Sequence, residues 1–343
     1  AIFQLPAGLL AERVGERNLL VVGTAIAGLA YIGLGLSSGF VALLAILFFV
    51  GLGSAVQHPL SASIISTAYA TGPRRAALGT YAFAGDVGKF AFAGGLGLLI
   101  AAGIDWRGPV VSLGVFTVLT AVVVLFVLLA VQIGGRPEKP QEKAEEAKVS
   151  GWGIREPTGF GALLGIMIVD NCTRNGFLTF VAFLLIAGNV DTELAAMAIP
   201  AILLGGMWGK LACGFLAERV GIIRTVIITE IGTAIGIVVM IFVEGDMAFF
   251  VLPLLGVVLN GTSSVLQGTI GDLVDQERQS RAFGLFFAIS AACGIAAPLG
   301  FGLLADAISI PTTMFVIAGI LLLTFPLCLV LSPILHAAAS PAE

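Results

Sequence analysis

Long apolar runs follow one another along the whole chain of 343 residues, each separated from the next by a few polar residues. A helix that crosses a membrane needs about 20 consecutive apolar residues. By that measure the sequence predicts one partial span over 1–11 and ten complete spans, at roughly 18–36, 40–66, 76–102, 108–132, 157–187, 192–216, 222–243, 247–270, 281–305 and 311–335. The runs are continuous rather than alternating, which excludes the strands of a membrane barrel as the spanning element.

The composition agrees with a chain that lies in lipid. Hydrophobic residues make up 58% of the sequence and charged residues 11%, with a mean hydropathy of +1.07, whereas soluble domains carry about 25% charged residues. We therefore expect an all-α integral membrane protein. The net charge of −4 argues against a nucleic-acid partner. The four cysteines fall in apolar spans without metal-ligand spacing, so we expect neither a metal nor a cofactor.

The cationic residues predict the orientation of these spans. Cytoplasmic loops of membrane proteins are rich in Lys and Arg. With the loop at Glu12–Arg17 placed inside, thirteen loop cations lie inside and only Arg107 lies outside. We expect a bacterial inner (plasma) membrane protein whose C-terminus is cytoplasmic. The polar, Pro-containing stretch 134–156 is predicted to be a cytoplasmic linker between two halves, 1–133 and 157–343.

An internal repeat supports this division into halves. The segment Gly8-Leu-Leu-Ala-Glu-Arg-Val-Gly15 returns 206 residues later as Gly214-Phe-Leu-Ala-Glu-Arg-Val-Gly221. Each copy closes one apolar span and opens the next. Repeated membrane halves that move around a central site are typical of secondary transporters.

These loops resemble the signature of the major facilitator superfamily, G-x-L-a-D/E-r-x-G followed by a basic pair. The residues that carry the resemblance are Gly8, Glu12, Arg13, Gly15 and Arg17 in the first copy, and Gly214, Glu218, Arg219 and Gly221 in the second. The resemblance covers the whole chain and implies two pseudo-symmetric helical bundles with about 11 transmembrane helices, family helices 2–12, the first being absent. It also implies a monomer, in which Glu12 caps a helix or binds an arginine and so latches one conformation.

Two departures from the family pattern bear on which branch of the superfamily the sequence resembles. Both motif copies carry Glu where Asp is commoner, and Leu47 stands where drug–proton antiporters of the family carry an arginine. The segments Gln57-His58-Pro59 and Gly85-Asp86-Val87-Gly88-Lys89 are similar to the fosmidomycin-resistance and organic-anion branches.

Charged residues within spans are the first candidates for a transport site, because they are costly in lipid and face a cavity or a partner. Asp86 and Lys89 are three residues apart and share one helix face. Asp170 and Arg174, four apart beside Asn171, do the same. Each set is interpreted either as a substrate-binding or proton-coupling group or as a static ion pair that fixes helix packing.

Further polar residues within spans are secondary candidates. Gln57 and His58 precede a proline, and His58 is either a titrating group or a neutral hydrogen-bonding one. Asn260 and Gln267 belong to a polar stripe that either lines a cavity or joins helices. Lys210 is expected to reach the membrane surface or the loop at Glu218. No partner for Glu230 is evident from the sequence.

No catalytic motif of the G-x-S-x-G, H-E-x-x-H or Walker A type occurs, and we predict that the protein is not an enzyme. The sequence favours a transporter that works by alternating access and moves a small anionic or zwitterionic solute, coupled to protons. Efflux by antiport and uptake by symport both fit. The alternatives are a facilitator without ion coupling and a non-transporting membrane sensor or assembly protein that kept the fold.

Overall fold

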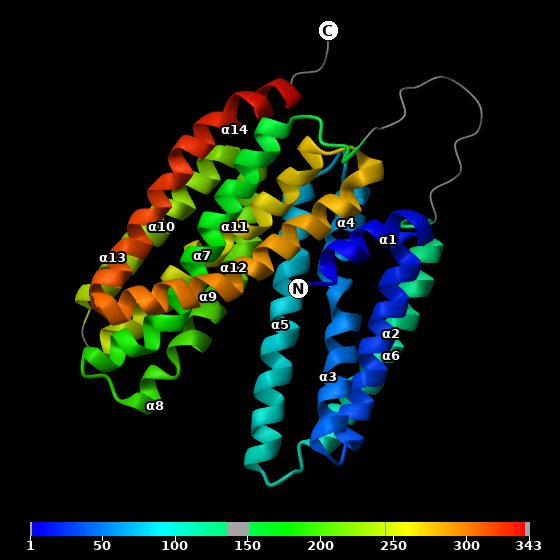
Figure 1. Cartoon of the computed structure of the whole chain (residues 1–343), viewed down its shortest axis with the longest axis horizontal. Coiled ribbons are helices and arrows are strands. Elements are labelled where there is room, and N and C mark those ends of the chain that lie inside the picture. Colours follow the sequence, from blue (N-terminus) through cyan, green and yellow to red (C-terminus); the bar gives the residue numbers. More distant parts are fainter. Residues whose placement is uncertain (1, 136–150, 244, 340–343) are drawn as a thin grey trace. The chain divides into compact units, whose positions relative to one another are not determined.

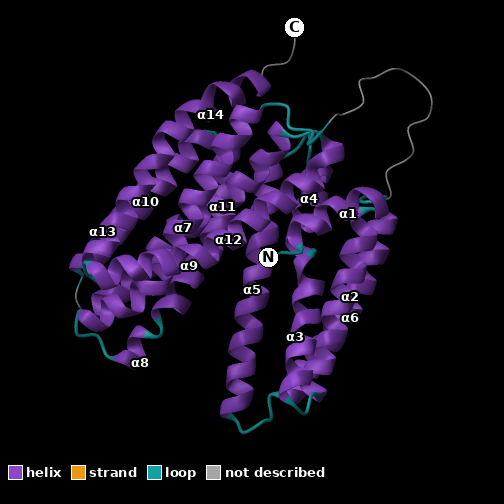
Figure 2. Cartoon of the chain, viewed as in Figure 1, coloured by secondary structure: helices purple, strands orange, loops and turns teal. Residues whose placement is uncertain are grey.

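Every regular element of the described residues, 2–135, 151–243 and 245–339 of a computed structural model, is helical (Figures 1 and 2). Most of the predicted linker lies outside these ranges. The α-helices are α1 Gln4–Val14, α2 Glu16–Leu36, α3 Phe40–Ala55, α4 Gln57–Ala68, α5 Arg74–Ala101, α6 Arg107–Ala130, α7 Pro157–Ala187, α8 Thr192–Ala195, α9 Ala198–Val220, α10 Ile222–Phe242, α11 Ala248–Leu273, α12 Gln279–Ala307, α13 Ile310–Ile320 and α14 Thr324–Ala339. Short 3-10 turns, η1 Gly245–Met247, η2 Gln276–Arg278 and η3 Leu321–Leu323, join some of them.

Each predicted span is a helix or a run of consecutive helices. The predicted span 40–66 is divided at Val56 into α3 and α4, and Pro59 lies in the first turn of α4. Proline is tolerated in a first helical turn because the amide hydrogen it lacks has no partner there. The span 311–335 is likewise divided into α13 and α14 by the 3-10 turn η3. The protein is thus an all-α membrane protein, as the sequence predicts.

The helix α7 differs from the other long helices in its polarity. Nine helical segments of the described chain are long and apolar enough to cross a membrane, and α7 is not among them despite its 31 residues. Its middle carries Asp170, Asn171, Arg174 and Asn175. The helix nevertheless buries a large apolar surface, including the fully buried ring of Phe177.

Contacts divide the chain into two compact units. The first unit comprises 1–70, 87–153 and 274–288, and the second comprises 71–86, 154–273 and 289–343. Each unit is built mainly from one of the predicted halves and takes a short segment from the other half. The second unit therefore contains the first turns of α5, and the first unit contains the start of α12. The division into halves at 133 and 157 stays a prediction.

Glycines allow the closest helix contacts in both units. In the second unit, α9 and α11 approach so closely that a Cβ atom at Gly205, Gly209 or Gly256 would meet a backbone carbonyl of the other helix. In the first unit, Gly28 of α2 and Gly114 of α6 face each other in the same way. Small residues replace the hydrophobic effect as the packing device in a bilayer, because lipid is as apolar as the side chains.

This packing predicts the effect of adding a methyl group. In Gly209→Ala the new Cβ meets the carbonyl oxygen of Val257, so we expect a loss of about 1–3 kcal/mol in the free energy of unfolding. Gly161→Ala on α7 is the matched control, since a Cβ there meets nothing within 4 Å and alanine favours a helix by about 1 kcal/mol. Thermal unfolding of the two purified variants checks this. Equal midpoints for both would contradict the close α9–α11 contact.

Candidate functional site

A buried ion pair connects α5 to α9 in the second unit. The ammonium group of Lys210 on α9 hydrogen-bonds to Oδ2 of Asp86 on α5, and their side chains are 19% and 17% exposed. The sequence led us to expect Lys89 beside Asp86, and Lys210 at the surface or at the Glu218 loop. No local spacing could have indicated a partner 124 positions away. Lys89 lies about one turn further along α5, in the first unit.

The polar middle of α7 forms a second group of contacts. Arg174 Nη1 lies 3.9 Å from Asp170 Oδ2, an ion pair without a hydrogen bond. Arg174 instead donates its hydrogen bond to Asn171 Oδ1 at 2.5 Å, and Ser290 of α12 donates to the same oxygen at 3.0 Å. Asp170 and Asn171 are almost completely buried.

The guanidinium of Arg174 keeps most of its hydrogen-bonding capacity. A guanidinium has five N–H donors in a planar fork, and only the bond to Asn171 is formed with the described residues. Oδ2 of Asp170 has no hydrogen-bond partner in the same part of the chain. The predicted Asp170–Arg174 pair is therefore present but incomplete, and Arg174 can bind a carboxylate or a phosphate in addition.

Glu230 on α10 is a further buried acid near Asp170 and Arg174. It is 2% exposed, and its Oε1 lies 2.9 Å from the hydroxyl of Thr262 on α11. The sequence left Glu230 without a partner, because Thr262 is on another helix. Glu230 is within electrostatic range of Asp170 and Arg174, and Asp170 is within range of Lys210. Together these five groups make what we call the buried charge cluster, defined as Asp86, Asp170, Arg174, Lys210 and Glu230.

Two residues of the polar stripe on α11 form hydrogen bonds to neighbouring helices, which the sequence alone could not show. Asn260 donates to the carbonyl of Gly256 in its own helix, and Ser264 donates to the carbonyl of Lys210 on α9. Thr262 bonds across to α10. Gln267 is half-buried and forms no hydrogen bond with described residues. The amide of Asn260 is buried and bonded within its own helix, and the role of Asn260 and Gln267 at a solute site stays a prediction.

Gln57 and His58 begin α4 and belong to the first unit. The imidazole of His58 stacks on Phe287 of α12, with ring centroids 5.7 Å apart and planes inclined by 26°. Gln57 is half-buried. The buried charge cluster belongs to the second unit, so the structure assigns the candidates of the sequence to two separate units.

The first copy of the repeated loop binds the start of α12. Glu12 on α1 is bound by Arg278, with Nη1 2.6 Å from Oε2, and by the fork of Arg281 through Nε and Nη2. Arg281 also donates to the carbonyl of Gly151 at 2.8 Å. A Cβ at Gly8 would collide with the carbonyl of Ser280. These contacts lie within the first unit, and the identity of both arginines was not evident from the motif.

The first copy of the repeated loop joins α1 to α2 through a glycine with a positive φ angle. Gly15 has φ +90°, a value that favours glycine, and it ends α1 and begins α2. The amide of Arg17 donates to the carbonyl of Gly134 at 2.7 Å. Arg13 is exposed. Gly221, at φ +96°, has the equivalent place between α9 and α10, and Arg219 before it is exposed as well.

The second copy binds the start of α5 in the second unit. Oε1 of Glu218 accepts the backbone N–H of Arg75 at 2.8 Å, at the end of the helix where amide groups lack partners. Asp272, the penultimate residue of α11, binds Arg74 Nη1 at 2.8 Å and also binds Arg75. A Cβ at Gly214 would lie 2.6 Å from the carbonyl of Arg75. The two copies thus make equivalent contacts, each with the start of a helix from the other half.

These contacts predict separate responses to two matched substitutions. Glu12→Gln removes the charge that Arg278 and Arg281 bind, and hydrogen bonds to charged groups contribute about 1.5–3 kcal/mol. We expect amide hydrogen exchange at 274–288 to become roughly 10–100 times faster, with 71–86 unchanged. Glu218→Gln is expected to do the reverse. A uniform response of both segments to either variant, measured by mass spectrometry, would contradict two independent latches.

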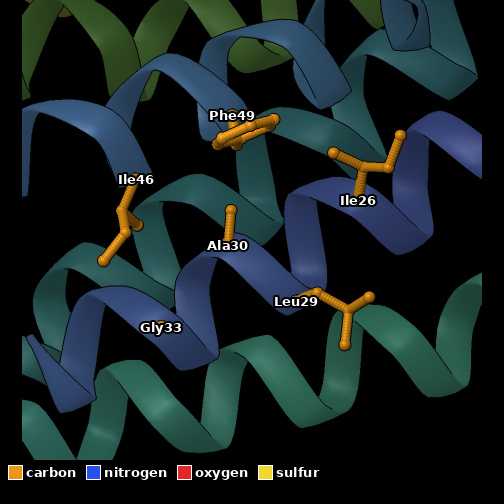
Figure 3. Close-up of a pocket in the computed structure, with 6 residues that line it drawn as sticks. All are labelled: Ile26, Leu29, Ala30, Gly33, Ile46 and Phe49. Carbon is orange, nitrogen blue, oxygen red and sulfur yellow. The ribbon is translucent and has the colours of Figure 1, made fainter. Parts of the chain in front are cut away.

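An apolar pocket of about 300 Å³ lies between α2 and α3 in the first unit (Figure 3). Ile26, Leu29, Ala30 and Gly33 line it from α2, and Ile46 and Phe49 line it from α3. It offers no charged or hydrogen-bonding side chain and so does not match an anionic solute. No group of three or more His, Cys, Asp or Glu residues that could hold a metal occurs within the described ranges.

Comparison with known proteins identifies the class. The family model of the major facilitator superfamily matches residues 1–212 and 163–343, so the chain belongs to this superfamily. It is 25% identical over 335 residues to an uncharacterised MFS-type transporter of Bacillus subtilis, YfnC, covering 93% of this chain and 78% of that protein. The chain is thus a membrane transporter of this superfamily, and its relatives are not enzymes.

Solved structures share the fold at low sequence identity. The Escherichia coli fucose:proton symporter FucP has a TM-score of 0.70 at 13% identity, over 95% of this chain and 86% of that one. The human organic anion transporter MFSD10 has a TM-score of 0.72 at 14% identity, over 95% and 80%. A bacterial homologue of the iron transporter ferroportin gives 0.70 at 14% identity, over 97% and 87%. At these identities the likeness shows the fold alone.

Proposed function

We propose that the protein is a proton-coupled secondary transporter that moves a small anionic or zwitterionic organic solute by alternating access. The observation that carries this proposal is the incompletely bonded guanidinium of Arg174, held beside Asp170 in the middle of α7. An arginine fork with donors to spare is suited to a carboxylate or phosphate. Ionisable residues buried among the helices of a membrane protein are candidates for a functional site by default, because their burial is costly.

The charges around Arg174 supply a reason for coupling to protons. In the solute-free protein, Arg174 neutralises Asp170. When an anionic solute takes the guanidinium, the buried carboxylate of Asp170 loses Arg174, its principal counter-ion, and this loss costs several kcal/mol. Protonation of Asp170 removes that cost. The anion and one proton therefore bind together, which favours symport. The direction of net movement follows the gradients.

The pair of Asp86 and Lys210 is the second part of the proposed site. It joins a helix of the first predicted half to a helix of the second, and Lys210 is within electrostatic range of Asp170. Lys210 is therefore a second cation for the solute, with Asp86 as its partner when the site is empty. Lys89, one turn further along α5, and Gln267 on α11 are further proposed contacts of the solute.

The two repeated loops are the proposed latches of alternating access. Glu12 and Glu218 each hold the start of a helix from the other half by charge-assisted bonds. Breaking and reforming a few such bonds is the kind of change that biases a two-state equilibrium. We place the loops and the C-terminus in the cytoplasm of a bacterial cell and expect a monomer in the plasma membrane. Membership of the major facilitator superfamily supports the general type of activity, and a fucose:proton symporter and an organic anion transporter have the same fold.

Reconstitution tests this function. Purified protein in proteoliposomes is supplied with radiolabelled small organic anions, with and without an imposed proton gradient. We expect accumulation above equilibrium only when the gradient is present. Equilibrative uptake that ignores the gradient would indicate a facilitator. Absence of uptake and of counterflow for carboxylates, phosphates and phosphonates alike would contradict an anion transporter.

A further inference from the structure

Glu230, Thr262 and Thr229 form a series of oxygen atoms at hydrogen-bonding distance from one another. The two threonine hydroxyls supply fewer hydrogens than this series has contacts. Glu230 Oε1 lies 2.9 Å from Thr262 Oγ1, and Thr262 Oγ1 lies 2.8 Å from Thr229 Oγ1. Thr229 Oγ1 in turn lies 2.9 Å from the carbonyl of Val226 and 3.0 Å from that of Thr225. All three side chains are 2% exposed or less. These groups thus make four oxygen–oxygen contacts in a dry environment, and the two carbonyls can share the one hydrogen of Thr229.

Each hydroxyl carries one hydrogen, and a carbonyl carries none. The hydrogen of Thr229 is directed to the backbone carbonyls of Val226 and Thr225, because those oxygens can only accept. The hydrogen of Thr262 can then serve either Thr229 or Glu230, but not both. If Glu230 were ionised, one pair of oxygens would lie 2.8–2.9 Å apart with no hydrogen between them. A proton on Glu230 completes the chain, with Glu230 donating to Thr262, Thr262 to Thr229, and Thr229 to the carbonyl.

The second carboxyl oxygen leads to the same conclusion. Oε2 of Glu230 is buried and has no hydrogen-bond partner among the described residues. Leaving an ionised carboxylate oxygen unsatisfied in a low-dielectric interior costs far more than leaving a neutral carbonyl oxygen unsatisfied.

The charges around Glu230 are few. Asp170 and Arg174 on α7 and the thiol of Cys328 on α14 are within electrostatic range. The neighbouring helix α13 has no ionisable side chain. On α9, Lys210 forms an ion pair with Asp86. From α11, the residue that contacts Glu230 is the neutral Thr262. Arg174 is therefore the cation shared by two acids, Asp170 and Glu230, and it can neutralise only one of them.

We propose that Glu230 is a second proton-binding site, which holds a proton in this conformation and alternates with Asp170 as the acid that Arg174 neutralises. When Arg174 is on Asp170, the proton is on Glu230. When Arg174 turns to Glu230, the proton is on Asp170. The participation of this exchange in transport rests on the function proposed above, whereas the protonation of Glu230 does not.

Infrared spectroscopy of the lipid-reconstituted protein tests this proposal without a transport assay. The C=O stretch of a protonated carboxyl group lies apart from the amide bands and shifts in D₂O. We expect this band in the wild-type protein and its loss in Glu230→Gln, whose amide can still donate to Thr262. We also expect its loss in Asp170→Asn, because Arg174 then ionises Glu230. In Arg174→Gln the band should grow, and roughly double at most, because both acids then lack the cation that they share.

Glu156→Gln, at an exposed acid, is the control and should leave the band unchanged. All spectra are recorded in a Glu16→Gln background, because Glu16, bound by Ser63, is a second shielded acid. A band that survives Glu230→Gln in that background overturns the proton on Glu230. A band that is lost in Glu230→Gln but kept in Asp170→Asn overturns the alternation, since Glu230 would then be neutral at all times. If proteoliposomes show no proton-driven uptake while the band follows the expected pattern, the proposed function fails and the protonation site stands.

Discussion

Replacing Arg174 by Gln is expected to raise the dissociation constant for the anionic solute at least roughly 30-fold and to stop its accumulation. Removing one partner of a buried charge pair costs about 2–5 kcal/mol, and each 1.4 kcal/mol is a factor of ten. Arg174→Lys keeps the charge but loses the planar fork that binds two oxygens at once. We therefore expect that variant to lie between the wild type and Arg174→Gln.

The measurement for this prediction is solute binding to purified protein by calorimetry, together with counterflow in proteoliposomes. Arg107→Gln is the matched control, because Arg107 is about half exposed and pairs with the exposed Asp105. Its solute affinity should equal that of the wild type. If Arg174→Gln bound the anion as tightly as Arg107→Gln does, the guanidinium of Arg174 would not be the anion-binding group.

The second large effect is expected at the Asp86–Lys210 pair. Lys210→Met removes the cation that Asp86 binds on α9, and Asp86→Asn removes the carboxylate that Lys210 binds on α5. Breaking a buried ion pair by removing one partner costs about 3–5 kcal/mol. The double variant Asp86→Asn/Lys210→Met removes both charges of the pair together, so its stability should recover most of that loss. Transport should not recover, because both groups belong to the proposed site.

Denaturant unfolding of the four proteins gives the coupling energy of this pair through a double-mutant cycle. A cycle in which the losses of stability simply add would contradict the ion pair. Recovery of both stability and transport in the double variant would reduce the pair to a packing element of α5 and α9.

The sequence was sufficient to predict the helices, because the length of an apolar run is itself the signal. The break at Val56 was not predicted, because α3 and α4 form one continuous apolar run. Pro59 is the one sequence feature that indicates this break, because proline is tolerated in the first turn of a helix. The polarity of α7 was evident from Asp170, Asn171 and Arg174, and that group of residues does lie together.

The partners across helices were beyond the sequence. Asp86 and Lys89 share a face of one helix, so the sequence pointed to Lys89 as the neighbour of Asp86. It gave no sign of Lys210, which binds Asp86 from another helix. The repeated loop indicated that Glu12 and Glu218 bind something, but nothing in its spacing pointed to Arg281 or Asp272. The same holds for Glu230, whose partner Thr262 is 32 positions away. Local periodicity reports contacts within one element, whereas these depend on how the elements pack.

The most direct test of the account is whether the anion brings a proton with it. Proteoliposomes without any imposed gradient are loaded with a pH-sensitive dye, and the transported anion is added outside. We predict that the lumen becomes acidic as the anion enters, in the wild-type protein. In the double variant Asp170→Asn/Glu230→Gln, which lacks both acids within electrostatic range of Arg174, we expect counterflow of the anion to persist without this acidification. Entry of the anion at an unchanged internal pH in the wild-type protein would contradict proton coupling through Asp170 and Arg174.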